Sequence, residues 1–221
     1  MSRVGAARST AASRAIDLLL ALPALVVLAP AFVLIAVAIR LDSPGSVFYR
    51  QERVGLHGAP FRIHKFRSMR AAADGPAVTV AGDIRVTRIG AHLRKWKVDE
   101  LPQLIDVVRG TMSLVGPRPE VPAYVALWPA EARDVILSVR PGITDPASVA
   151  FRNESEVLAS AEDPARYYVE VLLPQKVRLY VEYVQNRSVL GDLRVIGATI
   201  VAVLRERGAS PPETSRSAAG P

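Results

Sequence analysis

The chain has 221 residues, of which 50% are apolar, with 28 Lys and Arg against 21 Asp and Glu and no cysteine. That length suits one domain, the composition excludes general disorder, and the lack of cysteine excludes disulfides, thiolate metal sites and a cysteine nucleophile. The net charge of +7 and the isoelectric point near 10.1 predict an anionic partner: a nucleic acid, a phosphorylated ligand or an acidic lipid surface.

The apolar residues concentrate near the N-terminus, after a basic tail over residues 1–13. From Leu18 to Ile39 the chain has 22 residues without a charge. A helix of roughly 20 apolar residues can cross a bilayer, so this stretch is long enough to do so. A cleaved signal peptide is disfavoured, because its apolar region usually has only about 7–15 residues.

Pro30 lies close to the middle of this stretch. Proline removes a backbone donor and kinks or breaks a helix, so a kinked span is one interpretation. Basic residues flank both ends, however, and basic flanks prefer the cytoplasmic side of a membrane. The other interpretation is therefore a re-entrant helix over residues 14–41, broken at Pro30, that returns to the face it entered. The residues alone leave both open.

Residues 42–207 are expected to form one mixed α/β region that is mainly helical, with amphipathic helices lying at the membrane surface. Between Arg50 and Lys97 there are eleven basic residues and three acidic ones, so the positive charge of the chain is localised here. Segments 47–49 and 61–66 are typical of short strands, and the turn-like segment 55–58 between them predicts a β-hairpin. Residues 71–82 predict a mobile loop.

Helical periodicity follows in two steps. Apolar residues spaced four and three apart predict a helix around residues 89–96, and a second helix over 101–108 begins with Asp99 as its acidic cap and ends at Gly110. One or two amphipathic helices are expected over 167–184 and an apolar one over 195–204. Residues 208–221, rich in Ala, Ser, Pro and Gly, predict a disordered tail.

The strongest candidate for chemistry is the pair Asp99-Glu100, close to Arg94, Lys95 and Lys97 in the sequence. A carboxylate can attack phosphorus or carbon, and a second carboxylate can hold Mg²⁺, which prefers oxygen ligands. Arginine side chains can spread the charge of a phosphoryl group. A plain helix cap is the simpler explanation of an isolated Asp-Glu pair.

Two further motifs carry basic residues. In Gly116-Pro117-Arg118-Pro119 the prolines fix the backbone, so Arg118 is presented with little freedom, which suits either a phosphate clamp or a structural turn. The segment 65–70 interleaves basic residues with Phe66, a pattern compatible with nucleic-acid binding or with a solvated strand face. The three histidines show no metal-ligand spacing.

Taken together, these motifs resemble one family. They occur in its order: Phe48 to Gly55, Phe61 to Arg70, Asp99-Glu100-Leu101-Pro102-Gln103-Leu104, Met112 to Glu120, and Arg140-Pro141-Gly142-Ile143-Thr144. Over about residues 14–205 the chain resembles the bacterial sugar transferases, the small monotopic polyprenol-phosphate phosphoglycosyl transferases. Several motifs in fixed order make this resemblance specific.

The resemblance implies transfer of a sugar-1-phosphate from a nucleoside diphosphate sugar, such as a UDP-sugar, to a membrane polyprenol phosphate at the cytoplasmic face of the bacterial inner membrane. By this analogy Asp99 is the nucleophile and forms a phosphosugar–enzyme intermediate. Asp99 and Glu100 are the candidate Mg²⁺ ligands, Glu100 supporting either Mg²⁺ or the acceptor phosphate. Lys65, Arg94 and Arg118 match residues near phosphates, and Pro30 matches the proline that breaks the re-entrant helix. The product would start an exopolysaccharide, O-antigen or other glycan.

The chain departs from the common family pattern after Thr144. Many members continue with Gly-Trp-Ala-Gln-Val-Asn-Gly-Arg, whereas this chain has a different segment from Asp145 to Glu154. The change affects the expected donor more than the reaction class, with Arg140 and Arg152 as candidate nucleotide- or sugar-binding residues. The alternative function is a membrane-tethered nucleic-acid-binding protein that uses the basic stretch 50–97.

Overall fold

The computed structural model describes residues 11–70, 80 and 82–206. The first ten residues of the predicted basic tail, most of the predicted loop 71–82 and the predicted tail 208–221 lie outside the described residues. The fold is mainly helical, as the sequence predicts, and the described residues also form three small pairs of strands.

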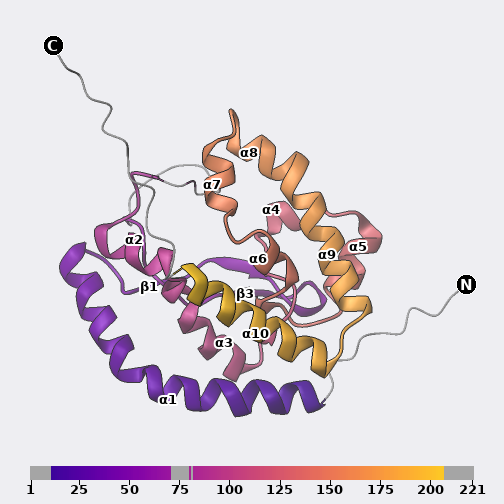
Figure 1. Cartoon of the computed structure of the whole chain (residues 1–221), viewed down its shortest axis with the longest axis horizontal. Coiled ribbons are helices and arrows are strands. Elements are labelled where there is room, and N and C mark those ends of the chain that lie inside the picture. Colours follow the sequence, from indigo (N-terminus) through magenta and orange to yellow (C-terminus); the bar gives the residue numbers. More distant parts are fainter. Residues whose placement is uncertain (1–10, 71–79, 81, 207–221) are drawn as a thin grey trace, which may run out of the picture.

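One helix, α1 (Ala11–Asp42), lies along the edge of the molecule (Figure 1). Pro23 and Pro30 are inside it, and the helix continues through both. Its axis bends, so that the first part follows the base of the molecule in Figure 1 and the last part turns up along the side. A proline lacks the N–H that closes the preceding turn, which accounts for a bend. The predicted helix is confirmed, and its interruption is a bend rather than a gap between two helices.

The N-terminal end of α1 is fastened to the rest of the molecule by two charged side chains. Arg14 donates to the carbonyl oxygen of Val107 at 2.5 Å, where it satisfies a carbonyl at the end of another helix. The buried carboxylate of Asp17 accepts from the Ser113 hydroxyl at 2.9 Å. This end of the apolar helix is therefore held by specific polar contacts.

The C-terminal end of α1 is held by a buried arginine. Arg67 donates to the carbonyl oxygens of Ser43 and Pro44, both at 2.7 Å, just beyond the last turn of the helix. Ile39, in that last turn, packs with Phe66 and Leu93 in a small core cluster. Both ends of α1 thus bind the same folded body.

The side of α1 that faces away from this body is apolar and exposed. The helix is long and apolar enough to cross a membrane. An exposed apolar surface this large marks an interaction site, with a membrane or another protein. The exposed large side chains are Leu19, Leu20, Leu22, Val26, Val27, Val33, Leu34, Val37 and Leu41.

The predicted β-hairpin is confirmed. Strand β1 (Phe48–Tyr49) pairs antiparallel with β4 (Lys65–Phe66), and β2 (Glu52–Val54) pairs antiparallel with β3 (Pro60–Arg62). The two pairs share one register, so they form a single hairpin closed by the turn η1 (Leu56–Gly58). The hairpin lies in the middle of the molecule, where β4 packs against the segment that carries the acidic pair.

After the hairpin come three short helical segments and a pair of strands. They are α2 (Arg88–Lys95), the 3-10 helix η2 (Val98–Gln103), α3 (Leu104–Arg109), and the parallel strands β5 (Ser113–Val115) and β6 (Gly142–Thr144). Gly110 ends α3 with φ +82°, as predicted. The predicted strands did not include β5 or β6.

Most of the remaining helices cover the side of the molecule opposite α1, while the last helix runs across the middle of the view (Figure 1). Their largest core cluster includes the buried rings of Trp128, Tyr168 and Tyr180. The amphipathic helices predicted over 167–184 are present, and the final helix begins six residues before the predicted 195–204. In order the elements are α4 (Pro122–Val125), α5 (Ala130–Ile136), α6 (Pro146–Ala150), α7 (Glu154–Ala159), α8 (Pro164–Tyr167), the π-helix η3 (Tyr168–Leu172), α9 (Leu173–Gln185) and α10 (Val189–Glu206).

Candidate active site

The acidic pair lies within η2, not at its cap. Lys97, the residue before η2, has φ +54°, a left-handed conformation that costs a non-glycine residue about 1–2 kcal/mol. The 3-10 turn starts at Val98, directly after Lys97, so Asp99 and Glu100 fall inside its first turn. The prediction that Asp99 caps the helix is therefore wrong, and its carboxylate is turned toward the hairpin instead.

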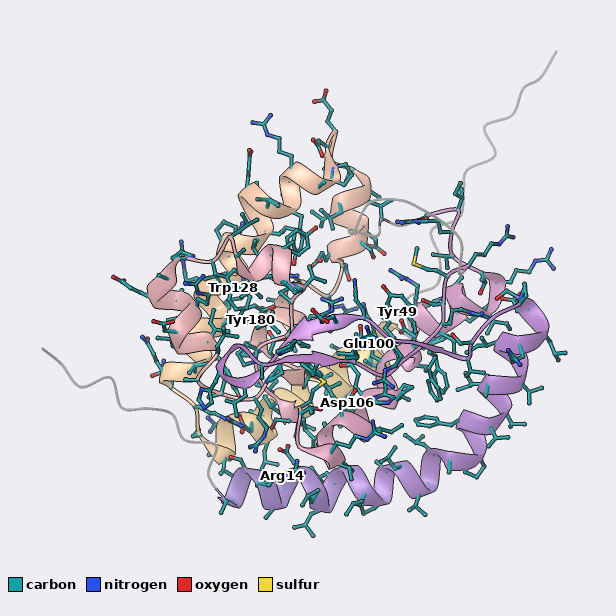
Figure 2. All side chains as sticks on the ribbon, turned by 180° about the vertical axis from the view of Figure 1, so that it is seen from behind. Arg14, Tyr49, Glu100, Asp106, Trp128 and Tyr180 are labelled. Atoms are coloured by element: carbon teal, nitrogen blue, oxygen red, sulfur yellow. The ribbon has the colours of Figure 1, made fainter. Side chains whose placement is uncertain are left out.

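Two cations from distant segments converge on this pair. The ammonium of Lys65, on β4, lies 3.0 Å from Asp99 Oδ2 and 3.2 Å from Glu100 Oε1. Arg118 donates from Nη1 to Glu100 Oε2 at 3.0 Å and from Nη2 to Glu100 Oε1, which makes the contact bidentate. Figure 2 shows Glu100 in the interior of the molecule beside the strands. Four of the sequence-predicted residues are thus brought together: Lys65, Asp99, Glu100 and Arg118.

The electrostatics of Glu100 follow from these neighbours. Burial raises the pKa of Glu100, but the charges of Arg118 and Lys65 outweigh burial and hold that pKa well below its usual range. The same pairing with Glu100 raises the pKa of Arg118. Glu100 therefore stays ionised at any physiological pH and fixes both cations in place.

Asp99 differs from Glu100 in one respect. Its side chain is only 2% exposed, yet Oδ1 has no hydrogen-bond partner, whereas Oδ2 faces Lys65. A buried carboxylate oxygen without a partner costs roughly 1–3 kcal/mol, so native proteins rarely leave one without a reason. Oδ1 is the atom of this site that is free to attack a substrate or bind a cation.

The loop that carries Arg118 is held by the parallel strands. The N–H of Gly116 donates to Thr144 at 3.0 Å, and the N–H of Gly142 donates to Pro117 at 3.0 Å. A Cβ at Gly142 would lie 2.1 Å from the nitrogen of Gly116, so the two chains approach closely only because this position is glycine. This close pairing and the prolines give Arg118 the fixed backbone that the sequence predicts.

A buried network on the other side of this loop was missed in the sequence. Arg53 donates to the carbonyl oxygen of Pro119 at 3.0 Å and lies 3.6 Å from the carboxylate of Glu120. The hydroxyl of Tyr168, within the π-helix, donates to Glu120 at 2.8 Å. Single π-turns of this kind frequently occur at functional sites. The only sequence signal for it was the acidic residue that follows Pro119.

Three other predicted residues make contacts with groups outside the acidic pair. Arg94 contacts the sulfur of Met69 at 3.8 Å. Arg140 donates to the carbonyl oxygen of Gly110 at 2.8 Å. Arg152 donates to the carbonyl oxygen of Ala202 at 3.3 Å, on α10.

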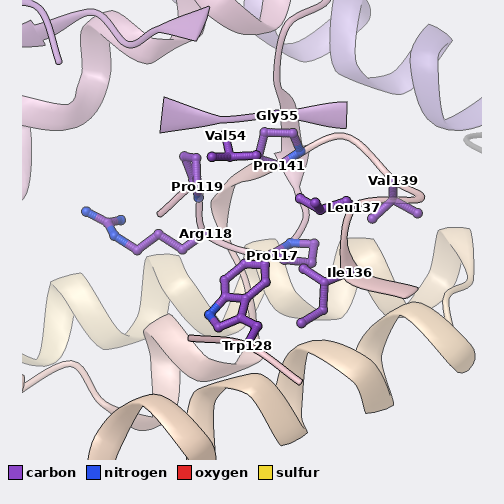
Figure 3. A pocket seen from close by; sticks show the side chains of 10 residues that line it. All are labelled: Val54, Gly55, Pro117, Arg118, Pro119, Trp128, Ile136, Leu137, Val139 and Pro141. Atoms are coloured by element: carbon purple, nitrogen blue, oxygen red, sulfur yellow. The ribbon is translucent and has the colours of Figure 1, made fainter. Parts of the chain in front are cut away.

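A small pocket lies beside the Arg118 loop (Figure 3). Its volume is about 10 Å³, enough for one water molecule and far too small for a sugar nucleotide. The guanidinium of Arg118 points away from the apolar lining, while Trp128 and Pro117 face into it (Figure 3). The pocket therefore supports the loop and is not a substrate site.

Arginine and lysine side chains gathered on a carboxylate pair form an arrangement that can bind phosphate groups. A sequence model of the bacterial sugar transferase family matches residues 8–206. The chain belongs to the bacterial sugar transferase family, so the predicted enzyme class is confirmed. This match favours the transferase over the nucleic-acid alternative.

The names of three similar proteins agree with this assignment. The chain is 39% identical to a UDP-glucose:undecaprenyl-phosphate glucose-1-phosphate transferase of Caulobacter vibrioides, over 86% of this chain and 69% of the relative. It is 36% identical to the enzyme of the same name in Escherichia coli, over 85% of this chain but only 39% of the relative. It is 35% identical to the exopolysaccharide production protein ExoY of Sinorhizobium fredii, over 88% of this chain and 86% of the relative.

Proposed function

We propose that this protein transfers a sugar-1-phosphate from a UDP-sugar to a membrane polyprenol phosphate, through a covalent aspartyl phosphosugar intermediate, and so starts the synthesis of an exopolysaccharide, O-antigen or related glycan. The observation that carries the proposal concerns the two carboxylate oxygens of Asp99. Oδ2 contacts Lys65, and Oδ1 is buried without a hydrogen-bond partner. Relatives that act on UDP-glucose or UDP-N-acetylgalactosamine and undecaprenyl phosphate support the two substrate classes.

In the first step Asp99 Oδ1 attacks the β-phosphorus of the donor. A bond forms between this oxygen and phosphorus, and the bond from the β-phosphorus to the oxygen that bridges it to the α-phosphate breaks. The electron pair leaves with nucleoside monophosphate, and the phosphosugar stays on Asp99. In the second step a phosphate oxygen of the polyprenol phosphate attacks the same phosphorus, and the carboxylate of Asp99 is released unchanged.

Lys65 and Arg118 are placed to bind the phosphates of both substrates. In this structure their charges are paired with those of Asp99 and Glu100, at 3.0–3.2 Å. A diphosphate that enters would share these cations, and preorganised cations stabilise the charge that develops on the transferred group. Glu100 keeps them aligned, because its low pKa leaves it charged throughout.

The residues also fit Mg²⁺. Asp99 Oδ1 has no partner and Glu100 is its neighbour, and Mg²⁺ is commonly bound by one or two carboxylates together with substrate phosphates. Among the residues that the structure describes, no group of three or more His, Cys, Asp or Glu could hold a metal, so the substrate would have to complete the coordination. Asp99 and Glu100 would hold the ion, which would neutralise phosphate charge when bound.

The proposal places α1 in the membrane as a re-entrant helix. A straight span would separate its two ends by the thickness of the bilayer, about 30 Å of hydrocarbon. Here Arg14 and Asp17 at one end and Ser43 at the other are bound to the same folded body. Val98, directly before Asp99, packs against the core cluster that Ile39 of α1 belongs to. The acidic pair would thus lie where a lipid phosphate meets a soluble nucleotide sugar, at the cytoplasmic face of the inner membrane.

Topology can be tested in this cysteine-free chain. Single cysteines replace Ala7 and Ser46, before and after α1, and are labelled in sealed vesicles of known orientation. We expect both to be labelled from the cytoplasmic side only. Labelling from opposite sides would refute the re-entrant arrangement and leave the chemistry of Asp99 to be judged separately.

The reaction is tested with the purified full chain, Mg²⁺, polyprenol phosphate and a panel of nucleoside diphosphate sugars labelled in the sugar. We expect release of nucleoside monophosphate from at least one donor and, without acceptor, label bound to the protein in an amount that does not exceed one per chain. Asp99→Asn should abolish both signals while the protein still enters membranes. Nucleotide release at the normal rate by Asp99→Asn would refute the assignment of the nucleophile.

A further inference from the structure

A second buried carboxylate, Asp106, lies one helix beyond the acidic pair and takes no part in the reaction described above. Its side chain is only 3% exposed, and it binds His64 at two points. Asp106 Oδ2 accepts the backbone N–H of His64 at 2.8 Å, and Oδ1 lies 2.6 Å from the ring nitrogen Nδ1. His64 is the residue directly before Lys65, which contacts both site carboxylates.

The backbone contact closes an open edge of the hairpin. In an antiparallel pair alternate residues direct their N–H to the partner strand, and the residues between them point away. The N–H of Ile63 and of Arg67 bind Gln51 and Val47 across the hairpin. His64 is between such positions, so its N–H points outward, where the carboxylate of Asp106 meets it. The carboxylate of Asp106 therefore accepts the hydrogen bond that a neighbouring strand would otherwise accept at this edge.

The ring contact fixes the orientation of His64. On the far side of the ring, Nε2 lies 3.3 Å from the guanidinium of Arg109. Arg109 can only donate, so the two contacts assign a neutral imidazole that donates from Nδ1 to Asp106 and accepts at Nε2. Both ring nitrogens and both carboxylate oxygens are then satisfied. A fully satisfied buried network of this kind holds a single conformation.

We infer that Asp106 is a positioning residue for the transfer reaction: by clamping His64, it fixes the strand from which Lys65 reaches Asp99 and Glu100. Successive strand residues point to opposite sides, so while His64 is held on α3, Lys65 is directed toward η2. Strand β4 has only two residues in its ladder, Lys65 and Phe66, so the ladder alone holds it weakly. Asp106 and Asp99 are on successive elements of one continuous segment, so the clamp ties the cation and the carboxylates to the same support.

The role of Asp106 in catalysis rests on the proposed function, but the position of Lys65 can be measured without it. An amine-acylating reagent must reach the amine, and the amine of Lys65 is held against Asp99 at 3.0 Å and Glu100 at 3.2 Å. We compare the acylation rate of Lys65 with that of exposed Lys95 in the full chain by peptide mass spectrometry. Asp106→Ala should raise the rate of Lys65 about tenfold and leave Lys95 unchanged, and Asp106→Asn should raise it less, because an amide oxygen still accepts the backbone N–H.

The matched control removes another buried carboxylate. Asp192 accepts from the Tyr183 hydroxyl at 2.7 Å, between α9 and α10 and apart from Lys65. Asp192→Ala should lower stability without changing the rate at Lys65. If Asp106→Ala leaves that rate unchanged, or Asp192→Ala changes it equally, the inference is overturned. Should Asp106→Ala fail to fold, an unchanged rate in Asp106→Asn overturns it.

Steady-state kinetics of the same variants test whether the contact between Asp106 and His64 affects the reaction. Misplacement of a reacting group by about 1 Å can cost about a hundredfold, so Asp106→Ala should lower kcat by about 10–100-fold with KM nearly unchanged, and Asp106→Asn by less. A rise in KM alone, or equal losses in the two variants, would contradict a positioning role. A wild-type chain that transfers nothing would refute the proposed function, while the acylation rates would still decide where Lys65 is held.

Discussion

Asp17 and Asp99 are both buried carboxylates, but they lie in different settings. Asp17, near the start of the apolar helix α1, accepts from the Ser113 hydroxyl at 2.9 Å and from the Leu114 N–H at 2.9 Å. Asp99, in the candidate active site, has one oxygen against Lys65 and one with no partner. Burial is nearly equal, 5% and 2% exposed, so it does not distinguish them. They differ in their hydrogen bonds. A carboxylate whose oxygens all have partners fastens elements together, whereas a carboxylate oxygen without a partner is available for chemistry.

The largest expected effect follows from removing charge at Asp99. Asp99→Asn should lower the rate of nucleotide release at least about a thousandfold, because an amide is a poor nucleophile. Its unfolding free energy should change by less than about 1 kcal/mol, since Lys65 keeps its contact with Glu100, and losing the ion pair of Oδ2 with Lys65 is offset by removing a buried charge whose Oδ1 has no partner. Activity assays and denaturant unfolding in the same detergent measure the two. A large loss of stability would place Asp99 in the same class as Asp17.

Asp17 should show the reverse pattern. Asp17→Ala leaves the buried Ser113 hydroxyl and the Leu114 N–H without their acceptor, so we expect a loss of about 2–4 kcal/mol in unfolding free energy. The folded fraction should keep its kcat within about threefold, because no atom of Asp17 reaches Glu100 or Lys65. Thermal unfolding and turnover per folded molecule give the two values. A hundredfold loss of kcat at unchanged stability would abolish the distinction between the two carboxylates.

Glu100 lies between Asp99, where we expect a loss of activity, and Asp17, where we expect a loss of stability. It belongs to the candidate active site, and its charge is fully paired. Its pKa is lowered in the folded protein, so its ion pairs contribute stability above the unfolded pKa of about 4.5 and lose that contribution as pH falls through the lower folded value. Glu100→Gln should therefore cost about 1–3 kcal/mol at pH 7, and the difference from wild type should shrink only below about pH 4.5. Unfolding curves from pH 7 to 3 measure this. A difference that already vanished near pH 6 would show that the pKa of Glu100 is not lowered.

Most regular elements could be predicted from the sequence, because their signals are local. The uncharged run from Leu18 to Ile39 predicted α1, and the turn residues near Gly55 predicted the hairpin. Strands β5 and β6 have three residues each and form only because Gly116 and Gly142 allow close approach, which no short window reveals. The start of η2 was misplaced because the left-handed Lys97 has no signature in the sequence.

The candidate site could be predicted only in part, because its contacts join residues that are distant in the sequence. The pair Asp99-Glu100, Lys65 and Arg118 are far apart in sequence, and the family resemblance rather than periodicity joined them. The supports of the site, Asp17 with Ser113 and Arg53 with Glu120 and Tyr168, are pairs of common polar residues separated by tens of positions. Nothing in either partner alone marks such a pair, so they appear only when the chain is folded.

The smallest expected effect concerns the hydroxyl of Tyr168, which satisfies a carboxylate as Ser113 satisfies Asp17. Burial and the nearby charge of Glu120 raise the pKa of Tyr168, so the hydroxyl stays protonated and donates to Glu120 at 2.8 Å. Tyr168→Phe removes this donor and should cost about 1 kcal/mol, with kcat lowered less than about threefold, because Arg53 still holds the Pro119 carbonyl. The matched control is Tyr124→Phe, because the ring centroid of Tyr124 lies 4.8 Å from that of Tyr168. This change should have a smaller effect on stability and on kcat. A loss of kcat above tenfold in Tyr168→Phe alone would show that Glu120 acts on the Arg118 loop as part of the catalytic site rather than as a support.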